Sequence, residues 1–499
     1  MLMNGTEYLE SLRDGRTIRI GSETVNDVTT HPAFKNAARS FARIWDARFN
    51  SEHANALVAH EGDDRFPAYY LIPKNRSDLE HRTRSATAVA DLSYGMMGRS
   101  PDFIGGYVTG AAMQQETFKT ANYDFSGNIS AYYKYCRDND IFLSHAVAPP
   151  QGTRDPIHYG RSSSFVPTLS VTSEGDDGLV INGIKMLATA AAFSHEVWIG
   201  NILPLAPGRE AESVTCVIPI NTPGLELWSR KPYERFAESE YDNPLAHRYD
   251  ESDCIVICRD VKVPWERVLT LGDIPWSRDI YFNTPAHTLS NHQAAVRYRS
   301  KLKLLVGIAH RVTESMGTHK VPAVADTLNH LSAMHATISA MISGQIQDHE
   351  ILSNGLACYN RRYMYAAIYF ATQNYDKILA RIRELTGGSV LQMPADSSVM
   401  DNEETKQIFD MCWSTNEWDA KDKMKLFKLA WDILGTDFAG RHSQYERFYM
   451  GPAFIVREHV GRETDWGEIL DFTDDLLASY DASGVTSKPK THPKKYSSE

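Results

Sequence analysis

Two short segments of the sequence combine side chains that could bind an acidic ligand and move its proton. In the first segment, Arg99 directly precedes Ser100 and Pro101, a pair that favours the start of a helix. The positive end of that helix would help an arginine to hold an anion. On sequence alone, a salt bridge from Arg99 to a local carboxylate such as Asp102 is the simpler explanation.

The second segment comprises residues 143–154, in which His145 is followed by two prolines and a glycine. It lies where a helical pattern gives way to a β pattern, and ligand clefts form preferentially at such domain boundaries. A histidine in a cleft could transfer a proton near neutral pH. A single histidine is more often structural than catalytic, so both interpretations stay open.

Three further features could line a ligand site. Residues 185–192 are mostly small and end a predicted strand, so a flat ligand could lie against their backbone, although close packing explains them equally well. Residues 435–451 form a predicted loop that is rich in glycine, polar and aromatic residues. His287 and His292 precede the predicted first bundle helix, where a capping or interface role is the simpler explanation.

Motifs of several common cofactor and hydrolase sites are absent. The sequence has no GxxxxGK[ST] phosphate loop, no GxGxxG after a strand, no HExxH pair and no GxSxG elbow. A nicotinamide site is therefore not expected. Cys254 and Cys258 lie on one face of a predicted strand, and we interpret them as ordinary thiols. No metal site is predicted.

Composition narrows the class of protein. The chain has 499 residues, of which 42% are hydrophobic and 23% charged, and its formal net charge is −11. This balance is typical of a globular protein, and the acidic charge argues against nucleic acid as a partner. The six scattered cysteines indicate reduced thiols. Because we find neither a leader pattern nor about 20 consecutive apolar residues, we expect a cytoplasmic protein without a membrane partner.

The elements that must position these residues fall into three regions. Residues 1–150 are mostly helical in pattern, residues 151–280 contain short β segments separated by turns, and residues 281–482 form long amphipathic helices. Four long helices in the last region predict a bundle, with Gly387 in the position of a C-terminal cap. Residues 483–499 predict a mobile tail. The expected fold class is α+β.

The motifs, taken in order, resemble those of one enzyme family, the oxygenase component of 4-hydroxyphenylacetate 3-monooxygenase. The resemblance runs from about residue 5 to about residue 475. The segments that carry it are residues 8–16, 27–34, 99–102, 145–154, 185–189 and 440–449. It implies an acyl-CoA dehydrogenase-like fold, with an N-terminal helical domain, a central β domain and a C-terminal four-helix bundle. It also implies a homotetramer built as a dimer of dimers.

The resemblance further implies an FADH2-dependent phenol monooxygenase of EC class 1.14.14. In this family a separate NAD(P)H-dependent flavin reductase supplies FADH2, and O2 is the co-substrate. The reduced flavin and O2 form a C4a-hydroperoxyflavin, which hydroxylates a phenolic ring. The ring reacts best as phenolate. Lowering a phenol pKa from near 10 to about 7 requires roughly 4 kcal/mol of preferential phenolate binding.

One charge-assisted hydrogen bond contributes about 1.5–3 kcal/mol, so two donors are needed. The resemblance assigns these catalytic roles to Arg99 and His145. The substrate-binding residues that it implies are Arg99, Phe103, His145, Asn201, Ile202 and His292, with residues 201–208 as a lid that excludes water. The flavin contacts that it implies are His145, Ala146, Val147, Gln151, Gly152, Thr153, Arg154, Thr189, Ala439, Gly440, Arg441 and His442.

Phe103 departs from the family pattern, which commonly has a tyrosine that hydrogen-bonds the phenol oxygen. The missing donor leaves the identity of the phenol open, and an already acidic halogenated or nitrated phenol would need less help. His287 or His292 could replace the missing contact. The ring position that is hydroxylated, the loss of a ring substituent and the identity of the reductase also stay open.

Two other functions remain possible at this stage. The superfamily includes 4-hydroxybutyryl-CoA dehydratase, a flavin-dependent lyase that also holds a [4Fe-4S] cluster through three cysteines and a histidine. Here the helix before Arg99 has no cysteine, and the residue seven beyond His292 is Arg299, so such a lyase would lack the cluster. The other possibility is a repurposed scaffold without oxygenation. Phe103 favours it, whereas the retained Arg99 and His145 disfavour it.

Overall fold

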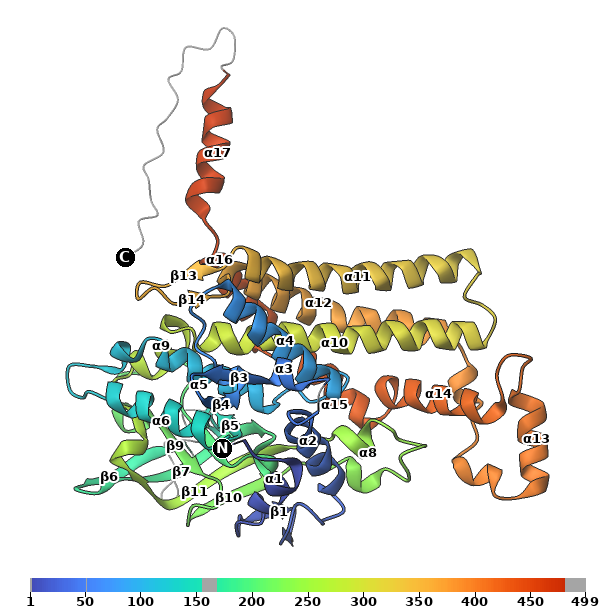
Figure 1. Ribbon diagram of the computed structural model, residues 1–499, viewed down its shortest axis with the longest axis horizontal. Helices are drawn as coiled ribbons and strands as arrows, with labels where there is room; N and C mark the ends of the chain where they lie inside the picture. Colours follow the sequence, from blue (N-terminus) through green and yellow to red (C-terminus); the bar gives the residue numbers. More distant parts are fainter. Residues whose placement is uncertain (1, 51, 155–167, 481–499) are drawn as a thin grey trace.

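The computed structural model describes residues 2–50, 52–154 and 168–480, and most of its strands gather in one part of the molecule, with short helices around them (Figure 1). Long helices lie together on one side, and the strands gather below them. The fold class is α+β, as expected from the sequence. No helix that the structure describes is both long and apolar enough to cross a membrane.

The N-terminal region is mainly helical. Its helices are α1 (Gly5–Ser11), α2 (Lys35–Ala47), α3 (Ala54–Leu57), α4 (Arg76–Leu92), α5 (Pro101–Ala112) and α6 (Ser126–Asp138). Its strands are β1 (Ile18–Ile20), β2 (Glu23–Val25), β3 (Val58–Glu61), β4 (Asp64–Pro67) and β5 (Leu143–Ala146). Ser100 is the N-cap of α5 and Pro101 its first residue, as predicted. The Ser100 hydroxyl donates to the Asp102 carboxylate over 2.5 Å instead of capping the backbone.

Two sheets form the β region. One has the strand order β2-β1-β10-β11-β7-β6, and the other has the order β12-β9-β8-β5. The strands not yet described are β6 (Ser170–Gly175), β7 (Gly178–Thr189), β8 (Glu196–Ile199), β9 (Val214–Pro219), β10 (Leu225–Ser229), β11 (Asp253–Pro264) and β12 (Val268–Leu271). The pattern of residues 165–181 in the sequence, two β segments separated by a glycine- and aspartate-rich turn, predicts a hairpin, and the antiparallel pair β6 and β7 confirms it for the described residues; residues 165–167 lie outside these.

The C-terminal region contains the four predicted long helices. These are α10 (Ala286–Ser315), α11 (Pro322–Gln347), α12 (Arg361–Thr386) and α14 (Ala420–Leu434). Gly387 follows α12 with a φ of 53°, in the left-handed region that glycine adopts easily. The sequence interpretation was wrong about His287 and His292, which lie inside α10 rather than before it.

The segment predicted as a glycine-rich loop at residues 435–451 is mostly the helix α15 (Asp437–Arg447). The Thr436 side chain accepts a hydrogen bond from the Ala439 N–H and so caps the start of this helix. The glycines in the segment had favoured a loop instead. The remaining helices are α8 (Ala246–Tyr249), α9 (Trp276–Asn283), α13 (Glu403–Trp413), α16 (Ala453–Arg462) and α17 (Trp466–Ala478). Two short strands, β13 (Glu350–Ile351) and β14 (Ala357–Cys358), pair between α11 and α12.

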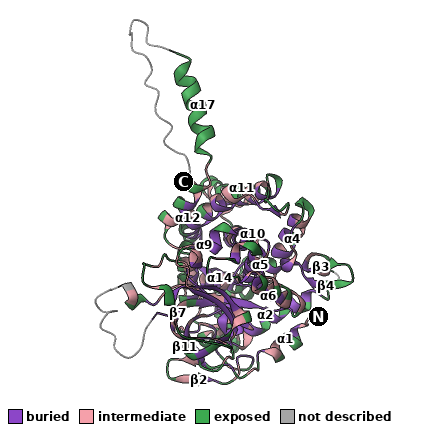
Figure 2. Cartoon of the chain, turned by 90° about the vertical axis from the view of Figure 1, so that its left-hand side faces the viewer, coloured by how far each residue is buried: buried purple, intermediate pink, exposed green. Residues whose placement is uncertain are grey.

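The predicted domain boundaries at residues 150 and 280 stay predictions. The sheets recruit strands from the N-terminal region, because β1 and β2 join one sheet and β5 joins the other. The predicted tail, residues 483–499, lies outside the described residues. α17 projects away from the rest of the molecule, and all of its residues are exposed (Figures 1 and 2).

Candidate active site

Arg99 lies immediately before α5, between two aromatic rings. Its guanidinium carbon is 3.9 Å from the ring centroid of Phe103 and 4.2 Å from that of Tyr449. The expected salt bridge with Asp102 is not formed, because the Asp102 carboxylate accepts hydrogen bonds from Ser100 and Gln293. Among the described residues, Nη1 of Arg99 is buried and has no hydrogen-bond partner. The guanidinium group can therefore donate a hydrogen bond to an anionic oxygen of a ligand.

His145 lies on β5 and also packs against Phe103, with ring centroids 5.8 Å apart. Burial and the nearby charge of Arg99 lower the pKa of His145 to about 3. The imidazole is therefore neutral at physiological pH. Its Nδ1 is buried and lacks a hydrogen-bond partner in the described part of the chain. A neutral histidine with a free ring nitrogen can form a hydrogen bond with a ligand hydroxyl.

Glu251 fixes the backbone that carries Arg99. Its Oε2 accepts hydrogen bonds from the backbone N–H groups of Gly98 and Arg99, over 2.8 and 2.9 Å. Its Oε1 accepts a hydrogen bond of 2.7 Å from Nη1 of Arg441 on α15. One buried carboxylate thus connects the start of α5 with α15.

The same arginine connects α15 with the end of β7. Arg441 donates through Nε and Nη2 to Asp253, over 3.0 and 2.7 Å, and the Thr189 hydroxyl donates to Asp253 over 2.6 Å. Burial opposes ionisation of this carboxyl, but Arg441 and Arg230 hold its pKa well below the usual range. The structure therefore brings Thr189 and Arg441, two predicted flavin contacts, to one carboxylate. The Arg441 guanidinium group is engaged by Asp253 and Glu251.

The segment after His145 runs beside the end of β7. The Met186 N–H donates to the Ala148 carbonyl over 2.8 Å, and the Gly200 N–H donates to the Ala146 carbonyl over 3.2 Å. Ala146 is buried and Val147 half-buried. Gln151, Gly152 and Thr153 belong to a short 3-10 helix, Gln151–Arg154; the side chain of Arg154 lies outside the described part.

The predicted contacts on α15 differ in their surroundings. Ala439 is buried, whereas Gly440 is exposed, and a side chain there would meet open space. His442 is fully buried, and its Nδ1 lies 3.0 Å from Nζ of Lys301. Any flavin contact of His442 itself stays a prediction.

Three predicted substrate residues have other partners in the structure. The Asn201 side chain accepts from Nζ of Lys185 over 2.7 Å and donates to the Glu212 carbonyl over 2.8 Å. Ile202 is half-buried against the main core. His292 stacks on Tyr359 with centroids 3.5 Å apart, and its ring nitrogens contact Gln345 and Thr83. These contacts give Asn201 and His292 structural roles, and their substrate roles stay predictions.

Sequence reasoning missed Tyr445 and Tyr449 as parts of this cluster. Both hydroxyl oxygens are buried without a hydrogen-bond partner among the described residues. The Tyr445 ring lies so close to Gly98 that a Cβ there would be 2.1 Å from the Tyr445 hydroxyl oxygen. Tyr445 lies on α15 and Tyr449 just after its end, so the expected loop at 435–451 gave no signal that the two rings would meet.

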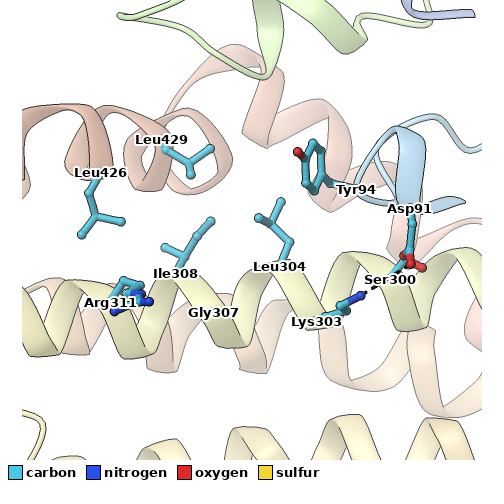
Figure 3. Close-up of a pocket in the computed structure, with 10 residues that line it drawn as sticks. All are labelled: Asp91, Tyr94, Ser300, Lys303, Leu304, Gly307, Ile308, Arg311, Leu426 and Leu429. Carbon is cyan, nitrogen blue, oxygen red and sulfur yellow. Dashed lines mark hydrogen bonds and ion pairs between the residues drawn. The ribbon is translucent and has the colours of Figure 1, made fainter. Parts of the chain in front are cut away.

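A separate cavity of about 400 Å³ lies between α10 and α14 (Figure 3). Leu304, Ile308, Leu426 and Leu429 point into it, and Lys303 and Arg311 lie at its rim. It contains none of the residues that the sequence assigned to the active site.

Two known family descriptions match most of the chain, including the residues around Arg99. Residues 4–270 match the 4-hydroxyphenylacetate 3-hydroxylase N-terminal family, and residues 277–478 match the corresponding C-terminal family. The chain belongs to this family. The resemblance seen in the sequence is confirmed, and the matched ranges include Arg99, His145 and Tyr449.

Similar proteins extend over nearly the whole chain. The 4-hydroxyphenylacetate 3-monooxygenase oxygenase component of Thermus thermophilus is 30% identical, covering 90% of this chain and 92% of that protein. The 4-nitrophenol 2-monooxygenase oxygenase component of a Rhodococcus species is 28% identical, covering 97% and 93%. A crystal structure of the first enzyme type with FAD and 4-hydroxyphenylacetate superimposes with a TM-score of 0.89, at 27% identity and covering 96% and 98%. The fold is therefore the acyl-CoA dehydrogenase-like fold of this family.

Proposed function

We propose that the chain is the oxygenase component of a two-component monooxygenase that uses FADH2 and O2 to hydroxylate a phenol. The observation that supports this most is the pair of buried atoms without a hydrogen-bond partner among the described residues, Nη1 of Arg99 and Nδ1 of His145, whose side chains both contact the Phe103 ring. Buried polar atoms are nearly always hydrogen-bonded, so a ligand oxygen is the expected partner. Relatives named for 4-hydroxyphenylacetate and 4-nitrophenol indicate the substrate class.

The two residues would divide the ionisation of the phenol. His145 is neutral, so its free ring nitrogen can accept a hydrogen bond from the phenol hydroxyl or, in the other tautomer, donate one to the phenolate oxygen. Arg99 holds the phenolate oxygen through a charge-assisted hydrogen bond. A neutral His145 that carries a proton on this nitrogen is then a second donor to the charged oxygen. The pair would thereby supply the roughly 4 kcal/mol that the ionisation requires.

The described residues fit a flavin at the end of β7. We propose that the flavin is bordered by the backbone of residues 145–153, by Thr189 and by the exposed Gly440. These groups are small or half-buried, so they leave space for a ligand next to Arg441, whose guanidinium group is held by its ion pairs. Bound FADH2, together with O2, would supply the oxygen atom and the electrons. Phe103 and Tyr449 exclude water from the Arg99 side of the site.

Two partners belong to the same proposal. A separate NAD(P)H-dependent flavin reductase in the cytoplasm would supply FADH2, as expected for an oxygenase component. The second partner is another copy of this chain, in a homotetramer. α17 supports self-association, because Trp466, Phe472, Leu476 and Leu477 are each more than half exposed on a helix that projects from the body (Figure 2).

The test is a coupled assay with purified protein, an added flavin reductase, NADH, FAD and a panel of phenols that includes 4-hydroxyphenylacetate and 4-nitrophenol. We expect a hydroxylated product from at least one phenol. That phenol should also lower the amount of H2O2 that is formed, relative to the same assay without a phenol. Consumption of all reducing equivalents as H2O2 with every phenol would contradict the proposal. The lyase and scaffold alternatives are not favoured, because the matched relatives are named as monooxygenases.

A further inference from the structure

Tyr449 lies beside the two groups proposed to hold the phenol oxygen. Its ring is 6.0 Å from that of Phe103, at an interplanar angle of 88°, and Arg99 lies against its face at 4.2 Å. Because His145 also contacts the Phe103 ring, Phe103 touches all three polar side chains. These side chains come from the start of α5, from β5 and from the turn after α15, so three separate elements converge on one point.

No hydrogen bond of standard geometry to the described residues explains the burial of the Tyr449 hydroxyl. Its oxygen is inaccessible to solvent and makes no hydrogen bond of standard geometry with the described residues. Tyr445 has a similarly unpartnered hydroxyl, but its ring lies farther from Arg99, at 5.6 Å, and closer to Arg441, at 4.4 Å. Tyr449 is therefore the tyrosine better placed for a ligand held by Arg99.

Burial keeps the Tyr449 hydroxyl protonated. It raises the pKa of Tyr449 to about 12, while the cations Arg99 and Arg297, and the close approach of Arg99 to the hydroxyl, oppose the rise. Glu446, on the preceding turn of α15, is bound by Arg297 over 2.6 and 2.7 Å and so balances that cation. A protonated phenol hydroxyl can donate a hydrogen bond at neutral pH.

We propose that Tyr449 donates a hydrogen bond to the substrate's phenolate oxygen, as a third donor beside Arg99 and His145. This inference rests on the proposed hydroxylation of a phenol. Phe103 has no hydroxyl to offer, and Tyr449, whose ring contacts that of Phe103, supplies a donor in its place. Tyr449 thereby selects ligands with an ionisable ring hydroxyl.

The test uses 4-fluorophenol as the probe, with the protein saturated with FAD, and follows binding by 19F NMR. The fluorine signal differs between the phenol and phenolate forms, so one titration gives both the Kd and the ionisation midpoint of the bound probe. We expect Tyr449→Phe to weaken binding about tenfold or more, the loss of one charge-assisted hydrogen bond. The ionisation midpoint of the bound probe should move to higher pH.

The melting temperature and the FAD affinity of Tyr449→Phe should not fall, because the hydroxyl that is removed makes no hydrogen bond of standard geometry in the described structure. Tyr298→Phe is the matched control, since Tyr298 is also buried with an unpartnered hydroxyl but makes no ring contact with Arg99. It should leave probe binding unchanged. Phe103→Tyr combined with Tyr449→Phe should restore part of the lost affinity.

The outcomes separate the two proposals. If the wild-type protein binds 4-fluorophenol and Tyr449→Phe binds it equally well, the role of Tyr449 is wrong and the phenol site stands. A lower melting temperature without a change in the ionisation midpoint would assign Tyr449 a purely structural role. If the wild-type protein with FAD binds no phenol, both proposals are wrong.

Discussion

Arg441 and Glu251 form a buried ion pair, with 2.7 Å between Nη1 and Oε1, that connects the side of the site proposed for the flavin to the side proposed for the phenol. Arg441 also binds Asp253 beside Thr189, while Glu251 also binds the backbone of Arg99. The position of Arg99 therefore depends on a carboxylate from the β region and an arginine from α15. Neither sheet nor bundle could build this site alone.

Glu251→Gln tests this dependence. The amide would keep the size of the side chain, but it would present an N–H group either to Arg441 or to the backbone donors. Breaking a buried pair of this kind typically costs about 3–5 kcal/mol, and part of that should appear as a lower melting temperature and a loss of hydroxylation. Glu80→Gln is the control, because Glu80 pairs with Arg76 on the surface of α4 and should change little. Equal effects of the two substitutions would contradict the dependence.

Removing the Arg99 side chain should separate binding from stability. Its guanidinium group is buried between aromatic rings, and Nη1 is unpartnered in the described structure, so we expect Arg99→Ala not to lower the melting temperature by much. The same change should lower kcat/KM for hydroxylation by about tenfold or more, because a charge-assisted hydrogen bond is lost. FAD affinity, measured by fluorescence titration, should stay near the wild-type value. A large loss of stability with full product yield would identify Arg99 as a structural residue.

The sequence predicted most of the architecture, because it depends on local patterns. The period of the apolar residues located the bundle helices, and Ser100 with Pro101 located the start of α5. The cluster itself was harder to predict. Tyr449 lies beside Arg99 only through tertiary packing. The glycines of residues 435–451 favoured a loop, whereas the N-cap at Thr436 stabilises the helix α15.

Some predicted residues could not be judged by residue type alone. A histidine that binds substrate and one that packs in a core have the same letter in the sequence. His145 has a buried ring nitrogen with no partner, whereas both ring nitrogens of His292 have protein contacts. Only the partners in space distinguish the two, and those partners are more than 50 residues away along the chain from His292.

Deleting α17 should reduce self-association. A truncation after residue 462 removes a helix whose residues are all exposed, so the fold of the remaining chain should keep its melting cooperativity. We expect size-exclusion chromatography with light scattering to show a smaller assembly than for the full chain. Phe472→Ser with Leu476→Ser should have the same effect, because it removes apolar area without shortening the chain. An unchanged mass for both variants would show that α17 does not hold copies together.

Acid should destabilise the protein through its buried neutral histidines, and His195 allows the clearest test. Its Nδ1 accepts a hydrogen bond from the Phe142 N–H over 2.9 Å, so its Nε2 donates to the Ser11 hydroxyl, 2.8 Å away. Burial, together with the charge of Arg16, lowers the pKa of His195 to about 3. The unfolded chain has the ordinary value near 6.5.

The sign of the effect follows from these two values. Below about pH 6.5 the unfolded chain binds a proton at His195 that the folded protein does not, so stability falls as the pH decreases toward about 3. One such group contributes a slope of roughly 1.4 kcal/mol per pH unit in this window. Urea unfolding of His195→Gln at several pH values from 7 to about 4 should show a shallower loss than the wild type. His60→Gln is the control, because His60 is exposed, and it should keep the wild-type dependence of stability on pH. If stability fell with pH equally steeply in His195→Gln and His60→Gln, His195 would not be the group responsible.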